Sequence, residues 1–425
     1  MRISTKLLTA DMAIVCLYSI YIFASISSLT KPRMQEVDLA AIPANHAKAT
    51  IQYPTGETTL KTVSTITAPL LTASKNETVA ADRFKDSHAT QVSKEEANNA
   101  ELRAHALRIW NSPWMQSQPP HRKILFFSAG NSGFLPFWQS WLCNTKAMQG
   151  VHQQTLLVTS GGNACEKLYP NDFDVATHCI PSEGKLHDEA LTYGTYGYWK
   201  ITLHRLEMVN FLLRSGISLL IFEPDAVWVQ NPLDDTDLLT QFDLRALRDG
   251  TAGIGFGWFL LRSNPQSIAV FDKVVADFGA QVRKHARLGL HEKMQIPGEQ
   301  DHFNGLLHSK QKHISFSNIT FSWFSNLKYL SGTWYDGGRG GSGEKTRADC
   351  KKEGMPYVIN NNWIVGNTPK ILRAKRWGHW FVQNDTDGSC RDDAKLKGQM
   401  KEMLSTMETL KPIRGPPLKG ECPLC

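Results

Sequence analysis

The chain has 425 residues, of which 41% are hydrophobic and 20% are charged, and this is the composition of an ordinary globular protein. The formal net charge of +7 is modest for this length and is not concentrated in a block of Lys and Arg with interleaved aromatic residues, so the sequence argues against a nucleic-acid partner. The chain is longer than one compact core, so segments outside the folded domain are expected.

The N-terminus predicts a membrane anchor. A basic tail (1–6) precedes an apolar stretch at 7–29, in which 12–29 carries no charge and is just long enough to cross a bilayer. A cleaved signal peptide is the alternative, because the apolar part is short and ends in small residues. The sequence Ser-Leu-Thr-Lys-Pro that follows is not a typical cleavage site, so a signal anchor is favoured.

Residues 30–115 are predicted to form a flexible lumenal stem. They are rich in Ala, Thr, Ser and Lys and poor in aromatic residues, so they bury too little apolar surface to fold, apart from a short helix around Lys94–Leu107. Aromatic residues return at Trp110 and Trp114. The folded domain is therefore expected at 116–400, followed by a C-terminal tail at 401–425.

The cysteines and glycosylation patterns favour a lumenal compartment. Seven of the eight cysteines lie beyond the apolar stretch, together with acceptor patterns at Asn76, Asn318 and Asn384. This arrangement suits disulfide formation, and the odd number predicts one free thiol. Cys422 and Cys425 form a CxxC pattern without a βαβ context, which is interpreted as a structural bridge or a loose end rather than a redox site.

Three apolar runs, at 123–131, 154–163 and 217–225, end in small or turn-forming residues. Helix-compatible stretches separate them, so they predict neighbouring parallel strands covered by helices. Ligands gather beyond the carboxyl ends of such strands, which places Ser128–Asn131, Ser160–Asn163 and Glu223–Asp225 on one rim. The turns match neither the dinucleotide-binding fingerprint nor the P-loop, so both chemistries are set aside.

Glu223 and Asp225 flank Pro224 directly after the third run. Side chains two apart on an extended chain point the same way, so the pair can hold a divalent cation beside turns whose N–H groups bind a diphosphate. The alternative is an ordinary solvated turn at the end of a strand.

Three further segments carry weaker signals. The Gly-rich stretch 250–263 predicts a strand whose backbone approaches another group closely, or a bulge. The stretch 298–307 predicts the start of a helix on which Glu299, Gln300 and Asn304 face one pocket, or on which the acidic residues only cap the helix. The glycine-dense segment 331–347 is expected to be a mobile surface loop or a lid.

Motifs that follow one another between about Lys123 and Trp380 resemble one family. They include the stretch 198–232 that contains Glu-Pro-Asp, the stretch Glu-Gln-Asp-His-Phe-Asn that starts at Glu299, and 357–380, which reads YVINNNWIVGNTPKILRAKRWGHW. Together they resemble the nucleotide-diphospho-sugar transferases of glycosyltransferase family 77, which are mostly Golgi-resident retaining enzymes. The resemblance implies an α/β fold of the GT-A type: a Rossmann-like mixed sheet flanked by helices, with a nucleotide-sugar half and an acceptor half.

The resemblance also implies a metal site. Glu223 and Asp225 stand where the family has an Asp-x-Asp motif whose carboxylates bind Mn²⁺ (or Mg²⁺), and the cation absorbs charge on the departing diphosphate. Asp225 is the first metal ligand, and Glu223 is the second or contacts the ribose. Asn360 occupies the position of a metal-binding His, and its amide oxygen is a weaker ligand for a hard cation.

Other residues acquire roles from the same comparison of motifs. Glu299 and Gln300 are predicted to be catalytic with Arg205, because the acid of that motif lies near the reacting sugar. The predicted donor-binding residues are Ser128, Asn131, Arg205, Asp225, Gly257, Asn304, Trp363, Gly366 and Lys370. His379 is a possible substitute metal ligand, although a lone His is more often a packed residue.

The expected function is transfer of a sugar, with retention, from a UDP-sugar to a glycan or glycoprotein acceptor by a Golgi type II membrane protein. UDP-galactose, UDP-xylose and UDP-arabinose all fit the family. Asn360, and the absence of an Asn before Gly257, motivate the alternative of an inactive paralogue that serves as a lumenal glycan-binding or scaffold protein. A metal-dependent glycoside hydrolase is weaker, since no separate acid and nucleophile pair stands out. Most of the twelve tryptophans are expected to fill the core.

Overall fold

The computed structural model describes residues 96–168, 173, 175–180, 185–238, 242–249, 253–308, 319–336, 354–385 and 387–409. All of them belong to one compact unit, residues 73–425. The predicted anchor, most of the predicted stem, two of the three glycosylation patterns and the CxxC pattern lie outside the described residues. Within the described ranges, no helix has the length and apolar character needed to cross a membrane.

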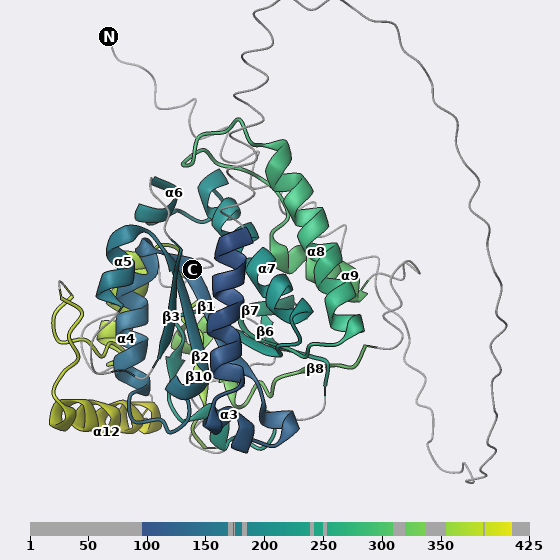
Figure 1. Cartoon of the computed structure of the whole chain (residues 1–425). Coiled ribbons are helices and arrows are strands. Elements are labelled where there is room, and N and C mark those ends of the chain that lie inside the picture. Colours follow the sequence, from purple (N-terminus) through teal and green to yellow (C-terminus); the bar gives the residue numbers. More distant parts are fainter. Residues whose placement is uncertain are drawn as a thin grey trace, which may run out of the picture. The chain divides into compact units, whose positions relative to one another are not determined.

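A seven-stranded mixed sheet forms the centre of this unit, with the strand order β3-β2-β1-β4-β7-β6-β8 (Figure 1). The strands are β1 (Leu125–Asn131), β2 (Thr155–Ser160), β3 (Ala176–Ile180), β4 (Leu219–Phe222), β6 (Leu244–Asp249), β7 (Gly253–Leu261) and β8 (Phe321–Trp323). β3, β2, β1 and β4 run parallel, β7 is antiparallel to both of its neighbours, and β8 is parallel to β6. The predicted mixed sheet is confirmed, and the three apolar runs are β1, β2 and β4.

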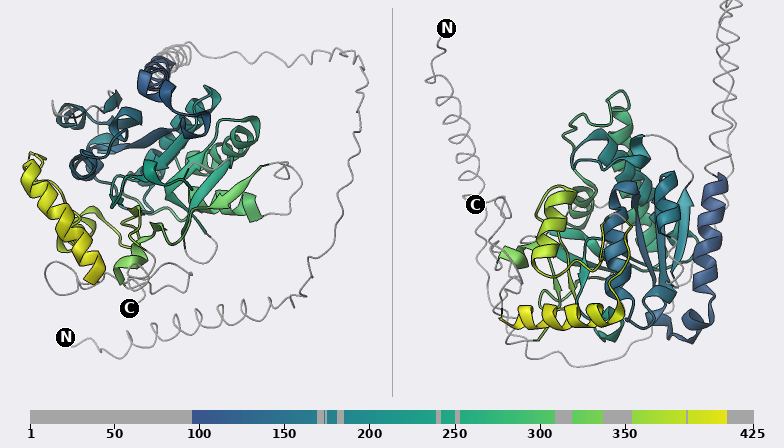
Figure 2. Two further views of the ribbon diagram at one scale, coloured as in Figure 1. Left: turned by 90° about the horizontal axis from the view of Figure 1, so that it is seen from below. Right: turned by 90° about the vertical axis from the view of Figure 1, so that its left-hand side faces the viewer.

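Apolar residues on both faces of the strands make the sheet the middle of three layers. In β1, Leu125 and Phe127 pack into one apolar cluster and Phe126 packs into another, because alternate side chains point to opposite faces. The helix at 96–110, α7, α8 and α9 cover the first face, and α4 covers the second (Figure 2). This burial on both faces is the reason that the strands read as continuous apolar runs.

Local sequence signals set the helix ends. Thr195 caps α7, since its Oγ1 accepts a hydrogen bond from the Tyr198 N–H, and Asn264 caps α8 in the same way, followed by a proline at the first helical position. The helices that follow the one at 96–110 are α3 (Pro113–Ser117), α4 (Leu135–Thr145), α5 (Gly162–Lys167), α6 (Lys185–Asp188), α7 (Tyr196–Arg214), α8 (Pro265–Lys284), α9 (Glu299–His308), α11 (Asn367–Arg376) and α12 (Asp393–Thr409).

A small sheet and the C-terminal helices form a second core beside α4. The sheet has the order β5-β10-β9, with β5 at Val227–Trp228, β9 at Tyr329–Leu330 and β10 at Val358–Ile359. A disulfide bond between Cys143 in α4 and Cys390 ties the segment before α12 to that helix, and the predicted formation of disulfides is confirmed for this pair.

Most of the segment 331–347, including its glycine-dense part, lies outside the described residues, so its assignment as a mobile surface loop stays a prediction. Its described part forms a 3₁₀ helix at Gly332–Asp336, in which the Trp334 and Tyr335 side chains are buried. Trp334 packs against Trp377, and Tyr335 packs against Trp377 and His379. Burial of these two large rings stabilises the described part of the segment.

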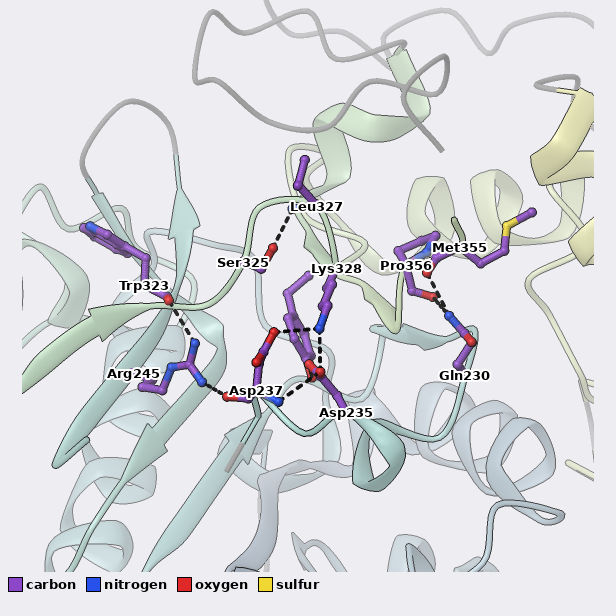
Figure 3. Close-up of polar contacts among 11 residues, drawn as sticks. Gln230, Asp235, Asp237, Arg245, Trp323, Ser325, Leu327, Lys328, Met355 and Pro356 are labelled. Carbon is purple, nitrogen blue, oxygen red and sulfur yellow. Dashed lines mark hydrogen bonds and ion pairs between the residues drawn. The ribbon is translucent and has the colours of Figure 1, made fainter. Parts of the chain in front are cut away.

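An ion-pair network joins the small sheet to the large one (Figure 3). Lys328, just before β9, donates to Asp235 and to Asp237 at 2.7 Å each. Asp235 is buried and also accepts from the Tyr329 hydroxyl at 2.8 Å. Arg245 of β6 donates to the backbone oxygens of Asp237 and Trp323. Every charged group of this network has a partner, so we interpret it as structural.

Candidate active site

A cavity of about 780 Å³ opens at the carboxyl edge of the large sheet. Its wall includes residues that follow β4, the end of β6, the start of β7, the start of α9 and the segment 360–372. Cavities of this size hold small ligands, and this edge of an α/β sheet is where ligands bind. Five carboxylates line it: Glu223, Asp225, Asp249, Glu299 and Asp301.

Asp225 and Lys370 form a buried ion pair in the cavity wall. The Lys370 Nζ atom lies 2.5 Å from Asp225 Oδ2, and Asp225 Oδ1 is buried without a hydrogen-bond partner. Burial raises the pKa of Asp225, and this effect outweighs the lowering by Lys370. Burial alone would lower the pKa of Lys370, but the charges of Asp225 and Glu223 raise it, so the ammonium group stays protonated.

Glu223 and Asn360 meet directly over β7. The Asn360 amide nitrogen donates to Glu223 Oε2 at 3.2 Å, which leaves Asn360 Oδ1 buried and unpartnered. A Cβ atom at Gly257 would lie 1.8 Å from the Asn360 amide nitrogen and 2.9 Å from Glu223 Oε2. Only glycine fits at this position of the strand, so the predicted close approach to the backbone of 250–263 is observed here.

Glu299 is held by Arg205 of α7. The Arg205 Nη2 atom donates to Glu299 Oε1 at 3.0 Å, and both side chains are largely buried. Burial raises the pKa of Glu299, while Arg205 acts in the opposite direction. Glu299 and Gln300 line the cavity, whereas Arg205 does not and acts on it through Glu299.

The other polar residues at the start of α9 support β7. Gln300 Oε1 accepts from the Phe256 N–H at 3.3 Å, and Asn304 Oδ1 accepts from the Ile254 N–H at 2.9 Å. Asn304 does not line the cavity. Its predicted contact with the donor is therefore replaced by a contact with the strand that carries Gly257.

Nine of the predicted site residues line one cavity: Glu223, Asp225, Gly257, Glu299, Gln300, Asn360, Trp363, Gly366 and Lys370. They come from four segments that are far apart in the chain. The structure brings them together, and their roles remain predictions.

Ser128 and Asn131 are not part of the cavity wall, in contrast to their prediction as donor ligands. Ser128 Oγ is buried and accepts a hydrogen bond from Trp138 Nε1 at 3.0 Å. The Asn131 side chain caps the turn after β1 and donates to the backbone oxygens of Leu186 and Glu189. Both side chains use their polar atoms within the fold, which sequence position alone does not reveal.

Asp249 is a cavity residue that the sequence did not single out. It ends β6, which runs in the same direction as β4, so its carboxylate reaches the same edge as Glu223. Burial and the charge of Glu223 raise its pKa to about 6, although a hydrogen bond from the Trp363 side chain lowers it. The residue is followed by glycine, so in the sequence it resembles an ordinary turn. The feature that could have identified Asp249 is its position at the end of a strand, on the edge of the sheet where the site was predicted.

The mouth of the cavity carries exposed apolar side chains. Tyr193 is 56% exposed, Val365 64%, Leu372 47% and Trp363 37%. Trp363 has a φ angle of 62°, an uncommon backbone conformation for a large residue, and it lies beside Asp249. An apolar rim around a carboxylate-lined cavity suits a ligand that has both apolar faces and hydroxyl groups.

His379 lies outside this cavity and is packed in the C-terminal core. It is buried, its Nδ1 atom is 2.8 Å from the Tyr335 hydroxyl, and burial lowers its pKa to about 3. The interpretation of His379 as a packed residue is therefore favoured over that of a substitute metal ligand. Trp258, Trp334 and Trp377 are also buried, as expected for core residues.

The residues around Asp225 fit a divalent cation. Asp225 Oδ1 and Asn360 Oδ1 are buried oxygens without partners, and Glu223 adds a carboxylate beside them. Carboxylate and amide oxygens are the ligands that Mn²⁺ and Mg²⁺ prefer. The ammonium group of Lys370 also binds Asp225, so a cation has to share that carboxylate with Lys370.

A carboxylate-lined cavity at the carboxyl edge of a mixed sheet is the kind of site in which α/β enzymes bind small ligands. The chain belongs to the nucleotide-diphospho-sugar transferase family, whose sequence profile matches residues 150–373, more than half of the chain. The family resemblance seen in the motifs is thereby confirmed, as is the predicted class, a nucleotide-diphospho-sugar-dependent glycosyltransferase.

Individual relatives are distant. The chain is 22% identical over 271 residues to UDP-D-xylose:L-fucose alpha-1,3-D-xylosyltransferase 3 of Arabidopsis thaliana, covering 59% of this chain and 64% of that protein. It is 21% identical over 220 residues to UDP-galactose:fucoside alpha-3-galactosyltransferase of Dictyostelium discoideum, covering 48% and 31%. The solved structure of galactosyltransferase LgtC with donor and acceptor sugar analogues aligns with a TM-score of 0.35 and 13% identity over 70% of this chain and all of that chain. The chain thus spans less than two thirds of these two sequence relatives.

Proposed function

We propose that the protein transfers a sugar from a UDP-sugar to a glycan or glycoprotein acceptor in the cavity described above. The observation that carries the proposal is the pair of buried, unpartnered oxygens, Asp225 Oδ1 and Asn360 Oδ1, beside the ammonium group of Lys370. Unpartnered buried oxygens are costly in a folded protein, so a ligand that completes their coordination explains them. Family membership and the two UDP-sugar-dependent relatives support the same donor class.

In this proposal Asp225, Glu223 and Asn360 hold Mn²⁺ or Mg²⁺. When bound, the cation neutralises negative charge on the diphosphate leaving group. Lys370 places a second positive charge next to Asp225, where it can bind a diphosphate oxygen. Glu299, oriented by Arg205, faces the sugar, and the GT-A type of fold, retention at the anomeric carbon and a Golgi location as a type II membrane protein are parts of the proposal.

The acceptor is proposed to bind at the apolar mouth. The Tyr193 and Trp363 rings present flat surfaces on which the C–H face of a sugar stacks, and Asp249 offers a carboxylate oxygen to its hydroxyl groups. The two relatives named above act on fucose or a fucoside, so fucosylated glycans are the first acceptors to test.

The proposal is tested by calorimetric titration of UDP into the full-length protein with and without Mn²⁺. We expect UDP binding that requires the metal and that is lost in Asp225→Ala. Asp234→Ala is the matched control, because it removes an exposed carboxylate from a nearby turn outside the cavity.

Incubation with UDP-xylose, UDP-galactose and UDP-arabinose, with and without a fucosylated acceptor, then separates transfer from hydrolysis. A new glycosidic product supports the proposal. Absence of UDP binding in the folded protein, together with retained binding of glycans, would contradict it and favour the inactive glycan-binding alternative that Asn360 motivates.

A further inference from the structure

Three metal-ligating side chains meet outside the cavity. Glu101 and His105 on the helix at 96–110 and His178 on β3 each offer one ligand atom, and these atoms lie within 4.8 Å of one another. None of the three lines the cavity around Asp225. The proposed sugar-transfer reaction does not use this cluster.

The fold explains why the three side chains meet. Glu101 and His105 are four residues apart and share one side of their helix, next to the buried stripe of Leu102, Ala106 and Ile109. That stripe packs into the same apolar cluster as Ile180, two residues after His178, and alternation along the strand directs His178 to the same face. The His105 and His178 rings are 5.4 Å apart.

One nitrogen of the His178 imidazole lacks a hydrogen-bond partner. The residue is only 1% exposed, and its Nδ1 atom is buried without a partner. An unpartnered buried polar atom destabilises the fold, and a bound ligand would remove that cost. Burial lowers the pKa of His178, so the imidazole is neutral at pH 7, which is the form that binds metal.

We propose that Glu101, His105 and His178 form a Zn²⁺ site that fastens the helix at 96–110 to β3, the edge strand of the large sheet. Two imidazoles and one carboxylate favour zinc over the Mn²⁺ or Mg²⁺ expected at the oxygen-rich cavity. Bonds of about 2.0–2.2 Å place tetrahedral ligands about 3.4 Å apart, so ligand atoms that lie within 4.8 Å of one another have to approach by at most about 1.4 Å. Glu101 is exposed and His105 is partly exposed, so both side chains have room for that movement, and water completes the coordination.

The Arg108 side chain is expected to weaken zinc binding at this site. Its Nη2 atom lies 2.8 Å from His105 Nδ1, while His105 Nε2 faces Glu101 Oε1 at 3.6 Å. Zinc binding through Nε2 places the ring proton on Nδ1, so the exposed Arg108 side chain has to move away. The removal of Arg108 should therefore tighten zinc binding, whereas a merely structural histidine pair would show no such response.

The test is calorimetric titration of Zn²⁺ into the full-length protein after dialysis against a chelator, with the bound metal measured by atomic emission. We expect one high-affinity zinc per chain, an affinity at least 100-fold lower in His178→Ala, and an affinity several-fold higher in Arg108→Ala. His291→Ala is the matched control, because His291 pairs with Glu189 at the surface and the described residues supply no third ligand there.

Thermal unfolding gives a second measurement. Added Zn²⁺ should raise the Tm of the wild-type protein but not that of His105→Ala, a partly exposed position whose substitution does not open the core. Zinc affinity that is the same in wild type, His178→Ala and His105→Ala would overturn the proposal. So would loss of the high-affinity zinc in Asp225→Ala, because the metal would then occupy the cavity.

Discussion

Helix α11 contributes one cation to each of two regions, and the two regions use it differently. Lys370 lines the cavity and pairs with Asp225. One turn later, Arg373 is fully buried in the C-terminal core, where it donates to Asn361 Oδ1 at 2.8 Å and to the Asn362 backbone oxygen at 2.5 Å and lies over the Tyr335 ring. The core is closed around its cation, whereas the cavity is open to solvent.

The adjacent asparagines show the same contrast. Asn361 accepts from Arg373 and donates to the Lys370 backbone oxygen at 3.1 Å, so both ends of its amide are used. The amide oxygen of Asn360 has no partner, and it lies in the cavity. The two neighbouring amides therefore differ: Asn361 uses both ends of its amide within the fold, whereas the Asn360 oxygen is available to a ligand.

The largest expected effect is loss of function on the cavity side. Asp225→Asn should reduce sugar transfer by at least about 1,000-fold, because it removes the charge that binds the metal. The substitution also leaves the buried ammonium group of Lys370 without its ion-pair partner, so the free energy of unfolding at pH 7 should fall as well. Steady-state kinetics and urea denaturation measure the two effects, and sugar transfer near the wild-type rate would contradict the prediction.

In the core, the expected effect is on stability. Trp334→Ala should lower the free energy of unfolding by about 3–5 kcal/mol, because it leaves a cavity among buried aromatic rings. Trp363→Ala is the matched control: the same substitution at a partly exposed cavity residue should cost less than about 1 kcal/mol. Equal losses of stability in the two variants would remove the distinction between the regions.

The disulfide bond lies in the C-terminal core and is expected to affect stability, not ligand binding. Cys143→Ser should lower the free energy of unfolding by about 2–4 kcal/mol, because the bond closes a long loop and its loss increases the entropy of the unfolded chain. UDP affinity of the folded variant should not change, because Cys143 and Cys390 lie outside the cavity wall. Denaturation measurements and UDP calorimetry on the same preparation test both parts.

A smaller, pH-dependent effect is expected at Asp249. Its pKa is raised from 3.8 to about 6 in the folded protein, so the wild type loses stability as the pH rises between these values. Asp249→Asn carries no such penalty and should gain about 1–3 kcal/mol over the wild type at pH 8 relative to their difference at pH 4. Thermal unfolding at both pH values measures this, and a difference independent of pH would contradict it.

The smallest effect is expected at the mouth of the cavity. Tyr193→Ala should raise the KM for the acceptor several-fold while leaving metal-dependent UDP binding unchanged, since the ring is exposed and stacks on one sugar. Tyr193→Phe keeps the ring and should behave like the wild type. An equal loss in UDP affinity would show that Tyr193 belongs to the donor half.

Elements with a clear local pattern were predictable. The runs that became β1, β2 and β4 and the start of α9 at Glu299 follow from periodicity and capping signals. The helix expected near 94–107 is present at 96–110, but it was assigned to the stem, whereas its Leu102, Ala106 and Ile109 side chains pack into the core. The burial of Trp334 depends on its contact with the distant Trp377, which the composition of the surrounding segment does not reveal.

The site residues that directly follow a predicted strand could be identified from the sequence. Glu223 and Asp225 stand after β4, and motif order connected them with Asn360 and Lys370. Ser128 and Asn131 also follow this rule, yet Trp138 and the backbone near α6 use their polar atoms. A rule based on neighbouring residues cannot show whether a polar side chain already has hydrogen-bond partners within the fold, because those partners come from distant parts of the chain.

The amino-acid sequence by itself determined the family, the alternation of strands and helices, and the presence of acidic residues at the edge of the sheet, because these depend on periodicity and on motifs a few residues long. Only the tertiary structure decided which polar atoms remain unpartnered: Asn360 but not Asn361, and His178 across from His105. Those distinctions depend on contacts between distant segments, and packing forms such contacts only after the helices have been placed on the sheet.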